Sequence, residues 1–297
     1  MFYKLAVAGV PGTGKSSVGL SFPGVQQHVF GSSEETTAVN FVGRTDILPP
    51  VKYDWFDTLT EAERNKFTDE KATELDVANL TKMGRARNVS RYRRLLYQLK
   101  SDIKAGKLPE LKTVFMDNGT PFSLEFEDYI EVIYGHEFKT KEGNFDGIAY
   151  HKRYASEFID FCRLFHSLEC HTVMSFHVSM VAGEEVAANT QFMKAASMGG
   201  VKKEWQPMIA GKAKFVMASI PDFVFFMKTE ESLGLPTKYI AKLEADESTI
   251  GAAKPRIQPF ENPRRIEFPK NKAFDVLDAA IKHYTTTGMP YRVGGHK

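Results

Sequence analysis

Short apolar runs and longer amphipathic segments alternate along this chain. Buried strands are predicted at five such runs, residues 3–8, 27–30, 112–117, 171–176 and 222–227. Helices are predicted where apolar residues recur every three to four positions, at residues 16–22, 89–103, 121–138, 149–168 and 273–284. Strands that alternate with helices are typical of an α/β fold, in which helices flank a mainly parallel sheet.

The C-terminal third follows a different pattern. The strand at 222–227 and an apolar segment at 239–243 are close enough to pair as a hairpin, which predicts an antiparallel C-terminal extension. A further extended segment holds Lys254 and Arg256 one residue apart, so that both side chains point to the same side. We predict a single domain over residues 1–287, followed by a frayed C-terminal tail at 288–297.

Two segments lack a clear pattern. Residues 41–81 are polar and predicted to be a surface insertion with a short helix at 58–66. Residues 178–206 are predicted to be a long mobile loop. Its aromatic and basic residues either bind single-stranded nucleic acid, by stacking and charge, or belong to an ordinary surface loop. These residues are Phe192, Lys194, Lys202, Lys203 and Trp205.

The strongest chemical signal follows the first predicted strand. The residues from Gly9 to Ser16 read Gly-x-x-x-x-Gly-Lys-Ser, which is the phosphate-binding P-loop, between a strand and a helix as the motif requires. Glycines let the loop turn its N–H groups toward an anion, and the helix that follows adds its positive end. The predicted nucleotide-binding residues are Gly9, Pro11, Gly12, Thr13, Gly14, Lys15, Ser16 and Ser17. Lys15 can reach the β- and γ-phosphates, and the Ser16 hydroxyl can bind Mg²⁺.

A second signal is the apolar strand that ends at Asp117. An aspartate after such a strand, about a hundred residues beyond a P-loop, is typical of the Walker B motif and predicts a carboxylate that holds Mg²⁺ largely through water. Asn118 and Thr120 follow it, and they either face the phosphates or cap the next helix. The predicted ligands are therefore ATP and Mg²⁺, with Ser16 and Asp117 as the metal-binding residues.

Acidic and imidazole groups at two other strand ends complete the predicted site. Glu34 and Glu35 follow the second strand, and a glutamate there can deprotonate the water that attacks the γ-phosphate. The alternative is that both acids lie in the first turn of a helix capped by Ser32 or Ser33. We favour Glu34 as the catalytic base, with Glu35 second. His177 ends the strand at 171–176, where it either contacts the γ-phosphate or merely terminates the strand.

Composition narrows the classes of partner. The chain has 297 residues, 42% hydrophobic, and a net charge of +2, so no overall field favours nucleic acid. Local basic residues between 82 and 107 form either a DNA-backbone surface or, slightly favoured, a solvated helix face. Only two cysteines occur, Cys162 and Cys170, and they suit a reducing compartment. With no signal peptide and no long apolar run, we expect a cytoplasmic protein with no membrane partner.

The order of these motifs carries a resemblance. After the P-loop, Glu34, Asp117 and His177 come Pro207, Gly211 and Lys212 in a Pro-x-x-x-Gly-Lys stretch, then Asp222-Phe-Val and Ala-Lys-Pro-Arg. This order resembles the phage-encoded, RecA-like P-loop ATPases of the single-strand-annealing and recombination group, often labelled only as phage nucleotide-binding proteins. The resemblance covers roughly residues 3–285.

The resemblance implies a RecA-like core that assembles head to tail as a ring or filament, with ATP between subunits. Lys254 and Arg256 match the stretch expected to reach the neighbour's γ-phosphate, although Pro255 stands where the family usually has an acid. Lys15, Glu34, Asp117, His177, Lys254 and Arg256 are then the catalytic residues. The implied function is DNA-stimulated ATP hydrolysis that promotes annealing or recombination in phage DNA metabolism, in the host cytoplasm. The implied partners are single-stranded DNA, further copies of the chain and a single-strand-binding protein.

Two other functions remain open from the residues alone. A small-molecule or nucleotide kinase shares the P-loop, and the arginines between 85 and 94 can be imagined as its lid. A nucleotide-gated assembly module for phage replication or packaging would hydrolyse ATP poorly, and Glu34 would then matter little.

Overall fold

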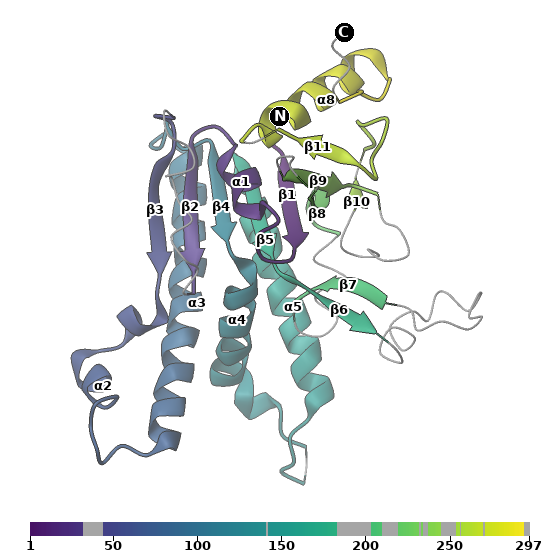
Figure 1. Cartoon of the computed structure of the whole chain (residues 1–297). Helices are drawn as coiled ribbons and strands as arrows, with labels where there is room; N and C mark the ends of the chain where they lie inside the picture. The colour runs from purple at the N-terminus through teal and green to yellow at the C-terminus, as the bar shows by residue number, and fades with distance from the viewer. Residues whose placement is uncertain are drawn as a thin grey trace.

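The computed structural model describes most of the chain, and most of its strands form one large sheet with helices on both faces (Figure 1). The residues described are 1–31, 44–140, 142–182, 203–209, 219–231, 233, 237–244, 254–255, 257–269 and 271–293. Glu34, Glu35, Arg256, Gly211, Lys212 and most of the loop predicted at 178–206 lie outside them.

The sheet has nine strands in the order β11-β9-β8-β1-β5-β4-β2-β3, with β10 paired to β8 outside that path. Its strands are β1 (Lys4–Gly9), β2 (Val25–Phe30), β3 (Leu48–Tyr53), β4 (Thr113–Asp117), β5 (His171–Phe176), β8 (Phe223–Glu230), β9 (Lys238–Lys242), β10 (Lys254–Pro255) and β11 (Ile266–Phe268). All pairs from β3 to β8 are parallel, whereas β9, β10 and β11 pair antiparallel. The predicted α/β class, a mainly parallel central sheet flanked by helices with an antiparallel C-terminal extension, is confirmed.

Side chains alternate between the two faces of the sheet and enter two separate cores. On β1, Ala6 belongs to one core, while its neighbours Leu5 and Val7 belong to the other. On β4, Met116 and Phe115 divide in the same way. Because both faces are covered, the strands read as continuous apolar runs, as expected for a buried parallel sheet.

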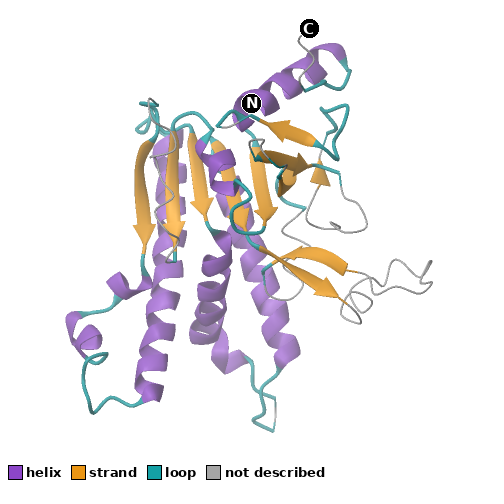
Figure 2. Ribbon diagram, in the orientation of Figure 1, coloured by secondary structure: helices purple, strands orange, loops and turns teal. Residues whose placement is uncertain are grey.

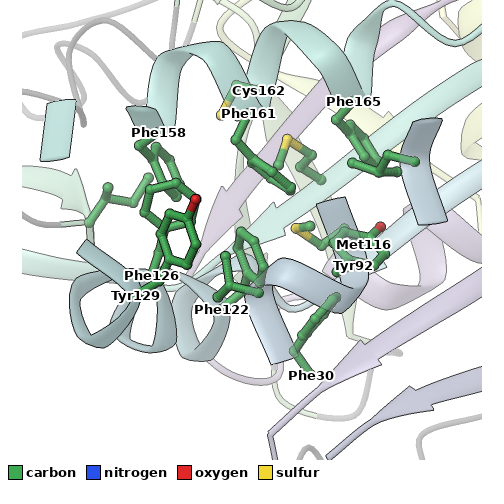
Figure 3. Packing of buried hydrophobic residues seen from close by; sticks show 14 of the residues in the cluster. Phe30, Tyr92, Met116, Phe122, Phe126, Tyr129, Phe158, Phe161, Cys162 and Phe165 are labelled. Atoms are coloured by element: carbon green, nitrogen blue, oxygen red, sulfur yellow. The ribbon is translucent and has the colours of Figure 1, made fainter. Parts of the chain in front are cut away.

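Three long helices cover one face: α3 (Glu74–Lys104), α4 (Gly119–Tyr134) and α5 (Gly147–His166) (Figure 2). Their core is largely aromatic (Figure 3). The Phe122 ring lies 4.5 Å from that of Phe161 and 4.9 Å from that of Phe30, between centroids. Aromatic pairs in such tilted and edge-to-face arrangements add to the stabilisation from burial.

Two shorter helices lie over the opposite face, α1 (Lys15–Leu20) and α8 (Ala273–Thr287). The Phe274 N–H donates to Ser21 Oγ at 3.0 Å, and the rings of Phe22 and Phe274 lie 4.9 Å apart. The C-terminal helix is thereby fastened to the end of the P-loop helix, although more than 250 residues separate them in the chain.

The segment predicted as a surface insertion, residues 41–81, contributes more to the fold than expected. It supplies the edge strand β3, a 3₁₀ turn at Trp55–Thr58, the short helix α2 (Glu61–Asn65) and the first residues of α3. Pro49 and Pro50 concealed the strand, because proline is tolerated only where a strand lies at the edge. The start of α3 is largely exposed and so lacks an apolar stripe, but Thr73 and Asp76 form a capping box there.

Two other segments also differ from expectation. The ends of the predicted mobile loop form a two-stranded antiparallel hairpin of β6 (Val178–Ala182) and β7 (Lys203–Pro207). In the predicted frayed tail, the Tyr291 N–H donates to Pro259 O at 2.7 Å, and Tyr291 O accepts from the Glu261 N–H at 3.0 Å. These two backbone hydrogen bonds hold the tail at Tyr291, a contact between distant segments that periodicity does not reveal.

Candidate nucleotide-binding site

The P-loop has the backbone that its glycines permit. Gly12 and Gly14 have φ values of 81° and 85°, in the left-handed region that glycine adopts at little cost. Gly9 is needed for close packing, since a Cβ there would lie 2.6 Å from Thr13 Oγ1 and 2.7 Å from Met227 O. The loop leads directly into α1, whose N-terminal N–H groups have no partner within a helix and form an anion-binding end.

Lys15 is held inside this loop. Its side chain is buried, and Nζ donates to the Val10 carbonyl at 2.8 Å. Burial lowers the pKa of Lys15 to about 8, and the nearby Asp117 carboxylate opposes that shift. A poorly solvated cation is stabilised when an anion binds next to it, so the site is suited to a phosphate group.

Asp117 lies at the end of β4 with partners from both neighbouring strands. Gln27 Nε2, on β2, donates to Oδ2 at 2.8 Å, and Ser175 Oγ, on β5, donates to Oδ1 at 2.7 Å. Both side chains thereby fix the orientation of a buried carboxylate. Neither residue was predicted, although a polar residue within an apolar strand was the available signal.

The donor set fits Mg²⁺. The Ser16 hydroxyl and the Asp117 carboxylate are hard oxygen ligands, the type that this ion prefers. Among the described residues there is no group of three or more His, Cys, Asp or Glu side chains that could hold a metal alone. Bound Mg²⁺ would therefore take its other ligands from phosphate oxygens and water, as it does in nucleotide sites.

His177 follows β5 and is positioned by the start of α4. Asn118 caps this helix, its Oδ1 accepting from the Thr120 N–H at 2.7 Å, which leaves its amide nitrogen to face His177 Nε2 at 2.7 Å. Thr120 Oγ1 accepts from the His177 N–H at 2.9 Å. Desolvation and the Lys15 charge both lower the pKa of His177. The ring accepts at Nε2, because the Asn118 amide nitrogen can only donate, and it is held beside the P-loop. Asn118 thus caps the helix, and Asn118 and Thr120 together position His177.

The strand order explains why these residues meet. Because β5 lies between β1 and β4, the P-loop, Asp117 and His177 come together at the carboxyl ends of three adjacent strands. Alternation places Gln27, Asp117 and Ser175 on the sheet face that α1 covers, in step with Val25, Phe115 and Val173 of that core.

Lys254 is placed differently. Its backbone pairs with Val224 on β8, and Val224 pairs with Ala6, three residues before the P-loop glycine Gly9. The main chain of Lys254 thus lies toward the amino end of β1, away from the phosphate-binding edge of its own chain. Arg256, like Glu34, lies outside the described residues.

Most of the basic residues on α3 contact other parts of the chain. Four of them form ion pairs with acidic residues of α2, α4 and α5, namely Lys82–Glu131, Arg85–Asp128, Arg87–Glu63 and Arg93–Glu157. Arg91 lies over the Tyr53 ring, with its guanidinium carbon 5.8 Å from the centroid. This pattern favours a structural role for the helix over a DNA-backbone surface.

The comparison with protein-family models agrees with a P-loop domain. A family model described as AAA domain, AAA_24, matches residues 1–257. The crystal structure of the flagellar accessory protein FlaH from Methanocaldococcus jannaschii is similar at 9% identity and a TM-score of 0.33, over 90% of this chain and 91% of that one. No curated protein sequence matches. No helix of the described residues is long and apolar enough to cross a membrane.

Proposed function

We propose that this chain, which belongs to the AAA domain family AAA_24, is an ATPase that hydrolyses ATP at the edge formed by β1, β4 and β5. The observation that carries the proposal is the convergence there of a buried P-loop lysine, an oriented aspartate and a positioned histidine. All three are linked to neighbouring strands or loops by hydrogen bonds, so they are preorganised before a nucleotide arrives.

The residues have separable roles in this mechanism. The P-loop amides and Lys15 bind the triphosphate and stabilise charge that develops on the γ-phosphoryl oxygens. Ser16 and Asp117 would hold Mg²⁺, which neutralises charge on the β- and γ-phosphates. Glu34 would take a proton from the attacking water, and His177 would hydrogen-bond the γ-phosphate or that water.

Substitution of Glu34 tests the hydrolytic step. Glu34→Gln should abolish turnover while ATP still binds, because the amide keeps the shape but cannot accept the proton. Glu35→Gln is the matched control and should retain turnover. If Glu34→Gln leaves turnover unchanged and Glu35→Gln abolishes it, Glu35 is the base. If both variants hydrolyse ATP at the wild-type rate, the nucleotide-gated assembly module becomes the better hypothesis.

We further propose that Lys254 and Arg256 act on the nucleotide of a neighbouring copy. Lys254 pairs with Val224, which in turn pairs with Ala6, three residues before the P-loop. Its main chain therefore lies away from the P-loop of its own chain, which supports a role in trans. A cation supplied by a second subunit stabilises transition-state charge. Electron microscopy with ATP and single-stranded DNA should then show a ring or filament with nucleotide at the subunit junctions. A strict monomer under those conditions contradicts this part of the proposal.

The β6–β7 hairpin supports an effect of single-stranded DNA on this site. The Met208 N–H, directly after β7, donates to the His177 carbonyl at 2.9 Å, and the Trp205 ring lies 6.2 Å from that of Phe226. Single-stranded DNA bound to the hairpin would therefore shift His177, the residue proposed to lie beside the γ-phosphate, through this hydrogen bond. Stacking of bases on aromatic side chains suits sequence-independent binding, as annealing or recombination requires.

Turnover measured with and without single-stranded DNA tests this part. Stimulation should be lost in Trp205→Ala and kept in Trp55→Ala, whose ring lies near α2 and α3 and far from the hairpin in sequence and fold. Absence of both DNA binding and stimulated turnover in the wild type would remove the annealing and recombination function. The kinase alternative is disfavoured, because Arg85, Arg87 and Arg93 are held in ion pairs.

A further inference from the structure

A cavity of about 130 Å³ lies beside the first turn of α1. One wall is the P-loop helix, and the other is the C-terminal extension, so the cavity joins the phosphate-binding loop to elements more than 200 residues away. The residues that line it are Gly14, Ser17, Val18, Met227, Tyr239, Phe268, Pro269, Asn271 and Ala273.

Strand pairing builds this cavity from distant segments. Gly9 on β1 pairs with Met227 on β8, Thr229 on β8 pairs with Tyr239 on β9, and Tyr239 pairs with Phe268 on β11. Directly paired residues project from the same face of a sheet. Tyr239 and Phe268 therefore extend the α1 face of the parallel sheet beyond β8.

Tyr239 lies against the phosphate-binding loop itself. A Cβ added to Gly14 would come within 2.7 Å of the Tyr239 ring. Gly14 is also left-handed, with φ of 85°. The glycine at this position thus serves the loop conformation and also leaves room for an aromatic ring beside the first turn of α1.

The chemistry of the lining suits a flat, mostly apolar ring with a polar edge. Val18, Met227, Phe268 and Ala273 are buried and provide apolar walls. Ser17, Tyr239 and Asn271 add hydroxyl and amide groups. An engineered apolar cavity of about 150 Å³ holds one benzene molecule, so this cavity has room for a ring system and not for a ribose and phosphates as well.

We propose that the cavity receives the purine base of the nucleotide, with Tyr239 stacked on the base and Asn271 hydrogen-bonded to its edge. This inference rests on the proposed ATPase function, because that function places the phosphates on the N-terminus of α1. From there the ribose leads along the first turn past Ser17, and the cavity is the space that borders this turn. The C-terminal extension, rather than the parallel core, then selects the base.

Asn271 makes the site selective for adenine. It has φ of 60°, a left-handed conformation that asparagine tolerates better than most residues. An asparagine amide can donate to adenine N7 and accept from the N6 amino group at once, a pairing that guanine cannot reproduce because O6 replaces the donor. ATP should therefore bind more tightly than GTP, CTP and UTP.

Binding of ATP, GTP and inorganic tripolyphosphate, measured by calorimetry, tests the proposal. Tyr239→Ala should weaken ATP binding about tenfold, the order of one stacked base, and leave tripolyphosphate binding unchanged. Tyr97→Ala, at an exposed position on α3, is the matched control and should behave like the wild type. Asn271→Asp, which retains a side chain suited to this backbone, should reduce the ratio of ATP to GTP affinity.

Photo-crosslinking gives a measurement that needs no variant. Wild-type protein irradiated with 8-azido-ATP should be labelled on a peptide containing Tyr239, Phe268 or Asn271. Labelling only elsewhere, or unchanged ATP affinity in Tyr239→Ala, overturns the base site while ATPase function stands. If the wild type binds neither ATP nor tripolyphosphate, the proposed function itself fails.

Discussion

The two faces of the central sheet differ in what fills them. Ten of the twelve largest fully buried side chains belong to the core under α3, α4 and α5, and only Phe22 and Phe115 belong to the core under α1 and α8. The first face is a dense aromatic layer (Figure 3). The second holds a six-residue helix, a cavity, and a lysine whose pKa burial lowers to about 8.

This difference indicates a division of labour. Aromatic burial on the first face adds to the stability of the domain. A cavity and a desolvated cation each cost stability, and a marginally stable domain tolerates them only when the rest of the fold compensates. Substitutions that act on one face should therefore move stability, and substitutions on the other should move nucleotide binding and turnover.

The largest expected effect is a loss of stability, from a substitution in the aromatic core under α3, α4 and α5. Phe122→Ala should lower the free energy of unfolding by about 3–5 kcal/mol, because it removes a ring in contact with Phe30, Tyr92 and Phe161 and leaves a cavity. Chemical denaturation measures this change. The control Leu124→Ala, on an exposed position of the same helix, should cost far less. Equal losses in both variants would contradict the assignment of stability to this face.

The next largest effect is a loss of turnover without unfolding, from a substitution on the face that α1 covers. Lys15→Ala should reduce turnover about 10²–10³-fold, the order seen when one preorganised charge-stabilising group is removed. The melting temperature should not fall, since a buried cation with a lowered pKa does not stabilise the fold. Lys104→Ala, at an exposed position on α3, serves as the control and should leave turnover intact. A large drop in stability for Lys15→Ala would mean that both faces support the fold.

Ser175→Ala sharpens the comparison within the site. It removes one of the two side-chain donors that orient Asp117, the other being Gln27. Supporting groups of this kind typically change metal affinity 10–100-fold. A Mg²⁺ titration of turnover should shift to higher concentration by that order, with the maximal rate partly restored at saturation. Ser90→Ala on α3 is the control, and an unshifted Mg²⁺ curve for Ser175→Ala would exclude the positioning role.

The smallest effect is a pH dependence of binding. Phosphate binding requires the Lys15 ammonium, and the lowered pKa of about 8 means that free protein loses this proton above that pH. ATP affinity should therefore be nearly constant at pH 6.5–7 and fall by up to about tenfold per pH unit above 8. Lys15→Arg keeps its charge at these pH values and should give a flatter profile. A wild-type affinity that stays constant to pH 10 would show that Lys15 is solvated.

The sequence was informative wherever a signal is local. It identified the P-loop, the Asp117 strand, the strand ending at His177 and the hairpin of β8 and β9, because each depends on neighbouring residues and their period. It failed at β3, where Pro49 and Pro50 conceal an edge strand, and at β6 and β7, which pair across an intervening segment of weak pattern. It also did not reveal that the α3 arginines form ion pairs, since their partners lie on other helices.

The candidate site shows which features local sequence patterns predict and which they do not. The alternation of side chains along a strand already put Asp117 in step with Phe115, and Ser175 in step with Val173, because that period is a property of the extended chain. Only tertiary structure decided that β5 lies between β1 and β4, and that Tyr239 and Asn271 lie beside Gly14. Strand order depends on pairing between residues as distant as Lys4 and Thr172, and no periodicity in the sequence encodes that choice.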